Sequence, residues 1–135
     1  DNVAFIDCPF TGETVTAVAA LNPDVGIIHA QRADRAGNVQ LWGITGVQLE
    51  VVLASARTVV TVEEIVDELD PQASDRTIPS MKIDAVAVVP GGARPSYALG
   101  YYERDNEAYR AWDHISSDRD RFTDWLKTHV MAVPS

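Results

Sequence analysis

Three short apolar runs constrain the fold of this chain more than any other feature of the sequence. They are Val25–Ala30, Thr58–Val62 and Ile83–Val89, and each is nearly continuous in apolar or β-branched residues. Runs of this kind are typical of strands covered on both faces of a parallel sheet, because a strand with one solvated face alternates apolar and polar residues. The sequence therefore predicts parallel strands centred on residues 28, 60 and 86.

Helical periodicity appears in two places. Val47, Val51 and Ala54 share one face of a helix over residues 47–56. Near the end of the chain, one helix face is formed by Phe122, Trp125, Leu126, His129 and Val130, and a preceding helix presents Tyr109, Trp112 and Ile115. Ser117, with Asp120 three residues later, is the predicted N-cap of the last helix.

The remaining segments give weaker patterns. Val3–Cys8 is predicted as a short strand, and Thr14–Leu21 fits either a helix or an extended segment. Val39–Trp42 is predicted to form a hairpin with the strand before it, because Gly37 suits the intervening turn. Glu63–Leu69 is expected to begin a short helix, and Pro71–Pro79 is expected to be a polar loop.

These patterns define the fold class as α/β, with an open and mainly parallel sheet, flanking helices and a helical C-terminal tail. With 135 residues, residues 1–135 are expected to form a single α/β domain that buries roughly two-thirds of its unfolded surface. The start at Asp1, which leads directly into an apolar strand, suggests a piece of a longer chain or a processed chain.

Net charge, hydropathy and cysteine content disfavour several classes of protein. The formal net charge of −9 disfavours nucleic acid and anionic lipid as partners. No apolar run approaches the ~20 residues that span a bilayer, so a membrane protein is not expected. The single Cys8 cannot form an internal disulfide, which favours a reducing compartment and a cytoplasmic location.

Candidate site residues follow the three predicted strands, because ligands of open α/β sheets bind beyond the carboxyl ends of the strands. The candidates are His29, Gln31, Arg32, Asp34, Glu63, Glu64, Gly91, Gly92, Arg94 and Ser96.

Each group has a chemical and a structural interpretation. His29 and Asp34 have the side chains of a general base and the carboxylate that orients it, but the favoured interpretation is a histidine whose ring is hydrogen-bonded to the backbone. Glu63 and Glu64 have the chemistry of a nucleophile or a general base, but the favoured interpretation is a pair of acids in the first turn of a helix. The loop at Gly91 and Gly92 fits equally an anion-binding backbone or a tight turn.

Two further groups complete the candidates. Arg94 is suited to a carboxylate or phosphate partner. A group of three tyrosines is formed by Tyr97, Tyr101 and Tyr102. If they are exposed, we expect them to form a surface that contacts a partner. If they are buried, we expect them to pack in the core with their hydroxyls at its edge. No His or Cys spacing suits a metal, so none is expected.

Taken in order, several segments resemble the A (alpha) subunit of family I coenzyme A transferases of the glutaconate type. They are Val25–Asp34, Gly37-Asn38, Trp42-Gly43, Thr61–Val66, Val86–Ser96 and Gly100–Tyr102. The resemblance extends from about residue 7 to about residue 130 and implies the CoA-transferase (NagB-RpiA-like) fold. It also adds Asn38 to the candidate residues at the rim of the cleft.

The resemblance implies a reaction in which CoA moves from an acyl-CoA to a carboxylic acid of the glutaconate or oxo-acid type. In this family a glutamate in a Glu-x-Gly motif, usually in the B (beta) subunit, forms a glutamyl-CoA intermediate. No glutamate of this chain is followed by a glycine two positions later, and the family's Gly-x-Gly-Gly loop is also absent. No catalytic residue is therefore assigned to this chain.

The expected partners are a B subunit, the N-terminal half of an A subunit, an acyl-CoA and a carboxylic acid, in a hetero-oligomer. Coenzyme A thioester is expected as substrate, with no bound cofactor. Two alternatives stay open: a CoA-thioester hydrolase of the same fold that opens rings in catabolism, and a non-catalytic α/β interaction module.

Overall fold

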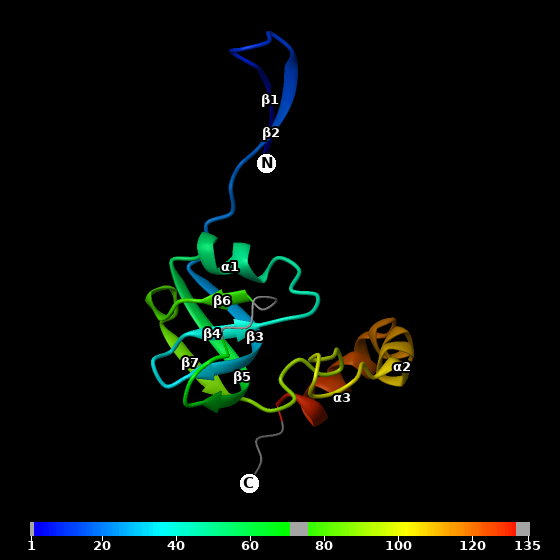
Figure 1. Ribbon diagram of the computed structural model, residues 1–135. Helices are drawn as coiled ribbons and strands as arrows, with labels where there is room; N and C mark the ends of the chain where they lie inside the picture. The colour runs from blue at the N-terminus through cyan, green and yellow to red at the C-terminus, as the bar shows by residue number, and fades with distance from the viewer. Residues whose placement is uncertain (1, 71–75, 132–135) are drawn as a thin grey trace.

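The computed structural model describes residues 2–70 and 76–131 (Figure 1). Its strands are β1 (Val3–Asp7), β2 (Thr14–Val18), β3 (Val25–Asp34), β4 (Val39–Leu41), β5 (Arg57–Val66), β6 (Arg76–Ile78) and β7 (Ala85–Val88). Its helices are α1 (Gln48–Ala54), a 3-10 turn (Ser80–Lys82), α2 (Asn106–Ser116) and α3 (Arg119–His129).

The main sheet has the strand order β6-β4-β3-β5-β7. Strands β3, β5 and β7 are parallel, while β4 and β6 add an antiparallel pair at one edge. Ile28, Val60 and Val86 lie opposite one another in the register of the three parallel strands. The predicted parallel strands and the predicted hairpin between β3 and β4 are thus confirmed.

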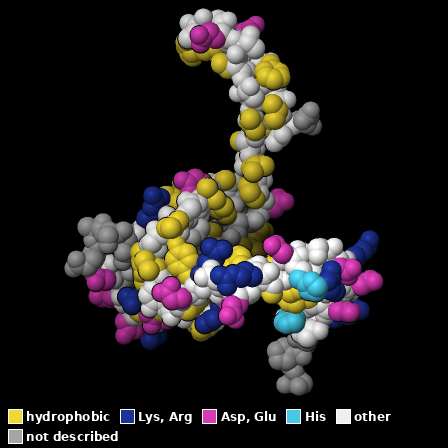
Figure 2. Space-filling view, turned by 90° about the vertical axis from the view of Figure 1, so that its right-hand side faces the viewer, with side chains coloured by type: hydrophobic (Ala, Val, Ile, Leu, Met, Phe, Trp, Pro, Cys, Tyr) yellow, Lys and Arg dark blue, Asp and Glu magenta, His cyan; other side chains and the backbone are white. Residues whose placement is uncertain are grey.

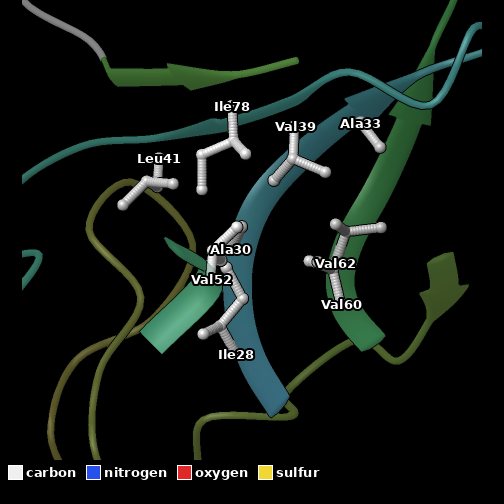
Figure 3. Packing of buried hydrophobic residues seen from close by; sticks show 9 residues of the cluster. All are labelled: Ile28, Ala30, Ala33, Val39, Leu41, Val52, Val60, Val62 and Ile78. Carbon is white, nitrogen blue, oxygen red and sulfur yellow. The ribbon is translucent and has the colours of Figure 1, made fainter. Parts of the chain in front are cut away.

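The hydrophobic core lies between the main sheet and α1. Its buried residues come from β3, β4, β5, β6 and α1, and Figure 3 shows them converging: Ile28, Ala30, Ala33, Val39, Leu41, Val52, Val60, Val62 and Ile78. Helix α1, predicted from its apolar face, contributes Val52, which is only 2% exposed. The sheet approaches α1 closely at Gly26, where an added Cβ would lie 2.9 Å from Val51.

Strand β5 continues further than the apolar run that predicted it. The parallel ladder pairs Arg32 with Glu64 and Asp34 with Val66, so the helix expected at Glu63–Leu69 is wrong. Acidic residues favour the first turn of a helix only weakly, whereas β3 satisfies the backbone N–H and C=O groups of this segment. Glu63 and Glu64 are consequently strand residues.

The first two strands form a separate antiparallel hairpin in which Val3 pairs with Val18. The ambiguous segment at residues 14–21 is therefore extended, as β2. The hairpin projects away from the main sheet (Figure 1), and Figure 2 shows apolar side chains along it. Phe5 is 77% exposed and Phe10 is 94% exposed.

The helical tail consists of α2 and α3, which are joined by aromatic contacts. The rings of Trp112 and Trp125 are 4.9 Å apart and nearly perpendicular, a favourable edge-to-face arrangement. The N-cap of α3 is Asp118, whose carboxylate accepts hydrogen bonds from the N–H groups of Asp120 and Arg121. Ser117 instead ends α2, so the predicted Ser117 cap is wrong by one residue.

Two further observations complete the fold. Strand β6 occupies the end of the expected loop Pro71–Pro79, of which residues 71–75 lie outside the described part. Within residues 2–70 and 76–131, no helix has the length and apolar character needed to cross a membrane.

Candidate functional site

Glu63 is the centre of a buried polar network at the carboxyl-terminal part of the parallel strands. Its Oε1 accepts hydrogen bonds from His29 Nε2 at 2.7 Å and from the Tyr102 hydroxyl at 2.8 Å. Its Oε2 accepts the Gly91 N–H at 2.8 Å. The Glu63 side chain is only 4% exposed. We call His29, Glu63, Gly91 and Tyr102 the Glu63 network.

Strand register explains why these residues meet. His29 on β3 lies opposite Thr61 on β5, and side chains two positions apart on a strand point to the same face. Glu63 therefore projects beside Thr61 and His29, and the Thr61 hydroxyl lies 2.8 Å from His29 Nδ1. Both ring nitrogens of His29 have side-chain partners, Thr61 and Glu63, and not the backbone partners that the favoured interpretation expected.

Glu64, the next residue on β5, forms a second and more exposed group. Its Oε1 accepts hydrogen bonds from Arg32 Nε at 2.8 Å and from the Tyr101 hydroxyl at 2.6 Å. Arg32 Nε also donates to the Tyr101 hydroxyl at 3.1 Å, and its guanidinium carbon lies 5.3 Å from the Trp42 ring centroid. Two adjacent glutamates thus hold two adjacent tyrosines.

The hydrogen bonds keep both glutamates ionised. Burial raises the pKa of Glu63, but the Gly91 N–H, the Tyr102 hydroxyl and His29 together bring that pKa below its usual value. The pKa of Glu64 is lowered by the Tyr101 hydroxyl and by Arg32. Burial and the neighbouring carboxylates raise the pKa of the hydroxyls of Tyr101 and Tyr102, so both are donors at neutral pH.

The loop after β7 is held by its own hydrogen bonds. The N–H of Gly92 donates to Val89 O, that of Arg94 to Gly91 O, and that of Ser96 to Ala93 O. The N–H of Ala93 donates to the Tyr102 hydroxyl, and that of Gly91 to Glu63. All these backbone donors are occupied internally, so the loop acts as a tight turn and offers no anion-binding backbone in this conformation.

Arg94 extends from this loop and is exposed. Its guanidinium carbon lies 4.6 Å from the centroid of the Tyr102 ring. Within residues 2–70 and 76–131, it forms no ion pair with an acidic side chain. The loop also covers His29, because a Cβ added at Gly92 would lie 2.8 Å from the imidazole ring.

Gln31 and Ser96 line an open cavity of about 340 Å³ beside the Glu63 network, together with His29 and Trp42. The rest of the wall is mainly apolar: Ile27, Ile28, Ile44, Val47, Val51, Ala93, Tyr97, Ala98 and Leu99, with Gln48. The Gln31 amide is occupied by the backbone N–H and C=O of Trp42. Gln31 therefore orders the cavity wall.

Asp34 and Asn38 lie outside this cluster and close the turn between β3 and β4. The Asp34 carboxylate accepts hydrogen bonds from the N–H groups of Ala36 and Asn38 and from the Asn38 side chain. Asn38 Oδ1 accepts the Ser80 N–H at 3.0 Å. The structure therefore does not pair Asp34 with His29; Glu63 takes that position.

Of the predicted candidates, the structure brings His29, Glu63 and Gly91 together, and their pairing is not predictable from the sequence. Thr61 and Trp42 are not among the predicted candidates, and no local pattern connects the hydroxyls of Tyr101 and Tyr102 to the two glutamates. The adjacent pairs Glu63-Glu64 and Tyr101-Tyr102 are the available signal. Among the described residues, no group of three or more His, Cys, Asp and Glu is arranged to hold a metal ion.

The parallel β3-β5-β7 sheet, its edge strands and the polar rim define an α/β protein of the kind that binds ligands beyond its strand ends. The coenzyme A transferase family model matches residues 8–88. The chain belongs to this family. The expectation from the sequence motifs is thereby confirmed for both family and fold.

Two curated relatives are A subunits of CoA-transferases. The chain is 56% identical over 132 residues to the A subunit of the 3-oxoadipate CoA-transferase of Pseudomonas knackmussii, covering 98% of the chain and 47% of that relative. It is 38% identical over 138 residues to the A subunit of the glutaconate CoA-transferase of Acidaminococcus fermentans, covering 98% of the chain and 42% of that relative. The chain thus spans about half the length of these relatives.

Solved structures agree with this assignment. The crystal structure of the Acidaminococcus fermentans glutaconate CoA-transferase matches 100% of this chain and 44% of its own, with a TM-score of 0.89 and 36% identity. The crystal structure of a variant of the decarboxylase AibA/AibB matches 96% of this chain and 47% of its own, with a TM-score of 0.75 and 32% identity. The same fold therefore occurs in proteins described by different reactions.

Proposed function

We propose that this chain is part of the A subunit of a CoA-transferase that moves CoA between an acyl-CoA and a short oxo-acid or dicarboxylic acid. The observation that carries the proposal is the 56% identity over 132 residues to the A subunit of a 3-oxoadipate CoA-transferase. The 38% identity to the glutaconate enzyme supports the same reaction class.

The nucleophile is proposed to come from a companion B subunit. The resemblance implies a glutamate in a Glu-x-Gly motif, and none of the glutamates here has that motif: Glu13, Glu50, Glu63, Glu64, Glu68, Glu103 and Glu107. Glu63 is also a poor nucleophile, because both of its oxygens accept hydrogen bonds and its pKa is lowered. This chain would then supply one wall of the active-site cleft.

In the proposed reaction, the companion glutamate attacks the acyl carbon of the acyl-CoA and expels CoA thiolate, which leaves a mixed anhydride. The thiolate then attacks the glutamyl carbonyl of that anhydride, so that a glutamyl-CoA thioester forms and the donor carboxylate is released. The incoming carboxylic acid then receives CoA from that thioester. The free acid of the donor and the new acyl-CoA are the products, so no free CoA accumulates. A hydrolase of the same fold would instead transfer the acyl group to water.

The proposed companions are consistent with the apolar surface of the chain. Ile27 is 70% exposed on the sheet face away from α1, and Ile44 is 84% exposed at the mouth of the cavity. Contiguous exposed apolar surface marks interaction sites in soluble proteins. The proposed occupants are a B subunit together with the remaining half of the A subunit.

The test is a CoA-transfer assay on the native complex, which is purified by capturing this chain together with its companions. We would supply 3-oxoadipyl-CoA with acetate or succinate and follow the new acyl-CoA, free CoA and carbon dioxide separately. The proposal predicts acetyl-CoA or succinyl-CoA without free CoA. Free CoA that forms regardless of the acceptor acid would support the hydrolase alternative, and carbon dioxide release would support a decarboxylase.

An assembly that gives none of these products would leave the interaction module as the better explanation. A lack of product needs a control, because the assembly would also be inactive with the wrong acyl-CoA donor. We would therefore repeat the assay with glutaconyl-CoA, since the second relative is a glutaconate CoA-transferase. Product formation with one donor only would identify the acyl preference and retain the proposed reaction class.

A further inference from the structure

Arg94 is an exposed cation that neighbouring residues hold in place, although no carboxylate of the described residues forms an ion pair with it. The chain carries 20 acidic and 11 basic residues, and several arginines pair with neighbouring carboxylates, as Arg32 does with Glu64. Arg94 has no such ion pair within the described residues. Its guanidinium carbon instead lies over the face of the Tyr102 ring, 4.6 Å from the centroid, which leaves the outer N–H groups available.

Two features hold the Arg94 side chain in place. The Tyr102 ring under the guanidinium is fixed by its hydroxyl, which donates to Glu63 and accepts the Ala93 N–H. Gly91 has a φ of +78°, and an added Cβ would lie 3.2 Å from Arg94 Nε. A glycine is therefore required for the backbone conformation and leaves room for the stem of Arg94.

The location of Arg94 is that expected for a ligand contact. The loop at residues 90–96 follows β7, at the carboxyl end of the parallel strands, and Gly92 covers His29 of the Glu63 network. In Figure 2, Lys and Arg side chains gather near the junction between the main body and the helical tail. In a chain of net charge −9, an anionic ligand needs such a local cation.

We propose that Arg94, held by Tyr102 and Glu63, binds an anionic oxygen of the substrates, either a carboxylate of the acid or a phosphate of CoA. This inference rests on the proposed function, which supplies both kinds of anion. A guanidinium presents parallel N–H donors that match carboxylate and phosphate oxygens. Because the loop is already braced, little conformational entropy is lost when the ligand binds.

The test compares Arg94→Gln with Arg57→Gln in the native assembly. Arg57 begins β5, at the opposite end of the parallel strands, and is exposed, so its loss changes net charge equally without touching the rim. Binding of CoA, dephospho-CoA and glutarate would be measured by titration calorimetry. We expect Arg94→Gln to weaken at least one probe by roughly tenfold to a hundredfold, and Arg57→Gln to weaken none by more than about twofold.

The probes distinguish the two anion sources. Weaker binding of CoA but unchanged binding of dephospho-CoA would assign Arg94 to the 3′-phosphate, and equal weakening of both would assign it to the pyrophosphate. Weaker binding of glutarate alone would assign it to the carboxylate. Arg94→Gln that behaves like Arg57→Gln with every probe would overturn the inference.

A second variant tests the role of Tyr102 as a positioning residue. Tyr102→Phe keeps the ring under Arg94 but removes the hydrogen bonds to Glu63 and Ala93. We expect it to weaken the same probe that Arg94→Gln weakens, by a smaller factor, and to leave the other probes unchanged. Since binding is measured without turnover, an assembly that binds CoA through Arg94 but transfers none would contradict the proposed function and retain this inference.

Discussion

At the scale of single residues, two neighbouring carboxylates on β5 have different environments. Glu63 points into the structure, where both of its oxygens accept hydrogen bonds from His29, Tyr102 and Gly91. Glu64 has a side chain that is 44% exposed and pairs with Arg32. The alternation of side chains along a strand separates the two acids, so the same substitution at each position has different consequences.

Glu63→Gln is expected to lower the free energy of unfolding by about 2–4 kcal/mol, because an amide nitrogen would face N–H and O–H donors in a buried site. The matched control is Glu64→Gln, which is expected to cost about 1 kcal/mol or less, since its ion pair is solvent-exposed. Urea denaturation of both variants gives the comparison. Equal effects at the two positions would contradict the described difference in burial.

The lowered pKa of Glu63 and Glu64 predicts a pH dependence of stability. Both values lie below the usual 4.5, so the folded state binds protons less readily than the unfolded state. The resulting stability is present above pH 4.5 and is lost as the pH falls through the folded-state values. Urea midpoints measured between about pH 7 and about pH 3 should fall on acidification, with a shallower fall in Glu63→Gln.

At the scale of elements, the close packing of α1 on β3 depends on Gly26. A Cβ at this position would collide with Ser55 Oγ and would lie 2.9 Å from Val51 Cγ1. The strand and the helix could not both keep their places, and the core between them includes Val52 and Ile28. Gly26 therefore sets the distance between the sheet and its covering helix.

Gly26→Ala is expected to destabilise the fold by about 1–3 kcal/mol through overpacking. Adding Ser55→Gly removes one of the two colliding side chains and should restore part of the loss, with Ser55→Gly alone as the reference. Thermal or urea unfolding measures all three variants. If the double variant is no more stable than Gly26→Ala, Ser55 is not the side chain that resists the added methyl.

At the scale of the whole molecule, apolar surface remains outside the core. The β1–β2 hairpin carries apolar residues on both faces, with Val3, Phe5 and Val18 on one and Ile6 and Val15 on the other. Two-stranded hairpins are marginally stable alone in water. Residues 1–31 contain no Lys or Arg. A partner with basic residues around its binding surface is therefore a better match for the hairpin than a second copy of this acidic chain.

Light scattering of the protein purified with its companions at micromolar concentration should give a mass well above that of one chain, with the companion present in the complex. Phe5→Ser, which changes only an exposed residue, is expected to weaken that complex while the unfolding free energy of the main sheet changes little. A complex unaffected by Phe5→Ser would exclude the hairpin from the interface. A stable monomer would contradict the proposed partnership itself.

The elements with strong periodicity could be predicted from the order of residues alone. The apolar runs centred on Ile28, Val60 and Val86 are adjacent parallel strands, as their apolar and β-branched residues predicted. The expected cover on both faces is wrong for β3 in this structure, because Val25 is 49% exposed and Ile27 is 70% exposed.

The helices α1, α2 and α3 follow from the 3.6-residue repeat. The buried face of α1 does not, because Val47 of the predicted face is 68% exposed and Val52 is the buried residue. The ordered motifs also predicted the family, since they resemble its A subunit in both residues and spacing.

The extent of β5 and the partners of its acids, in contrast, depend on the folded chain. Whether Glu63 lies in a helix or a strand is set by hydrogen bonds to β3, which is more than twenty residues away along the chain and absent from any local window. The contacts of Glu63 with His29 and Tyr102 span 34 and 39 residues. Such pairings arise from strand register and loop placement, which long-range packing fixes and local sequence does not.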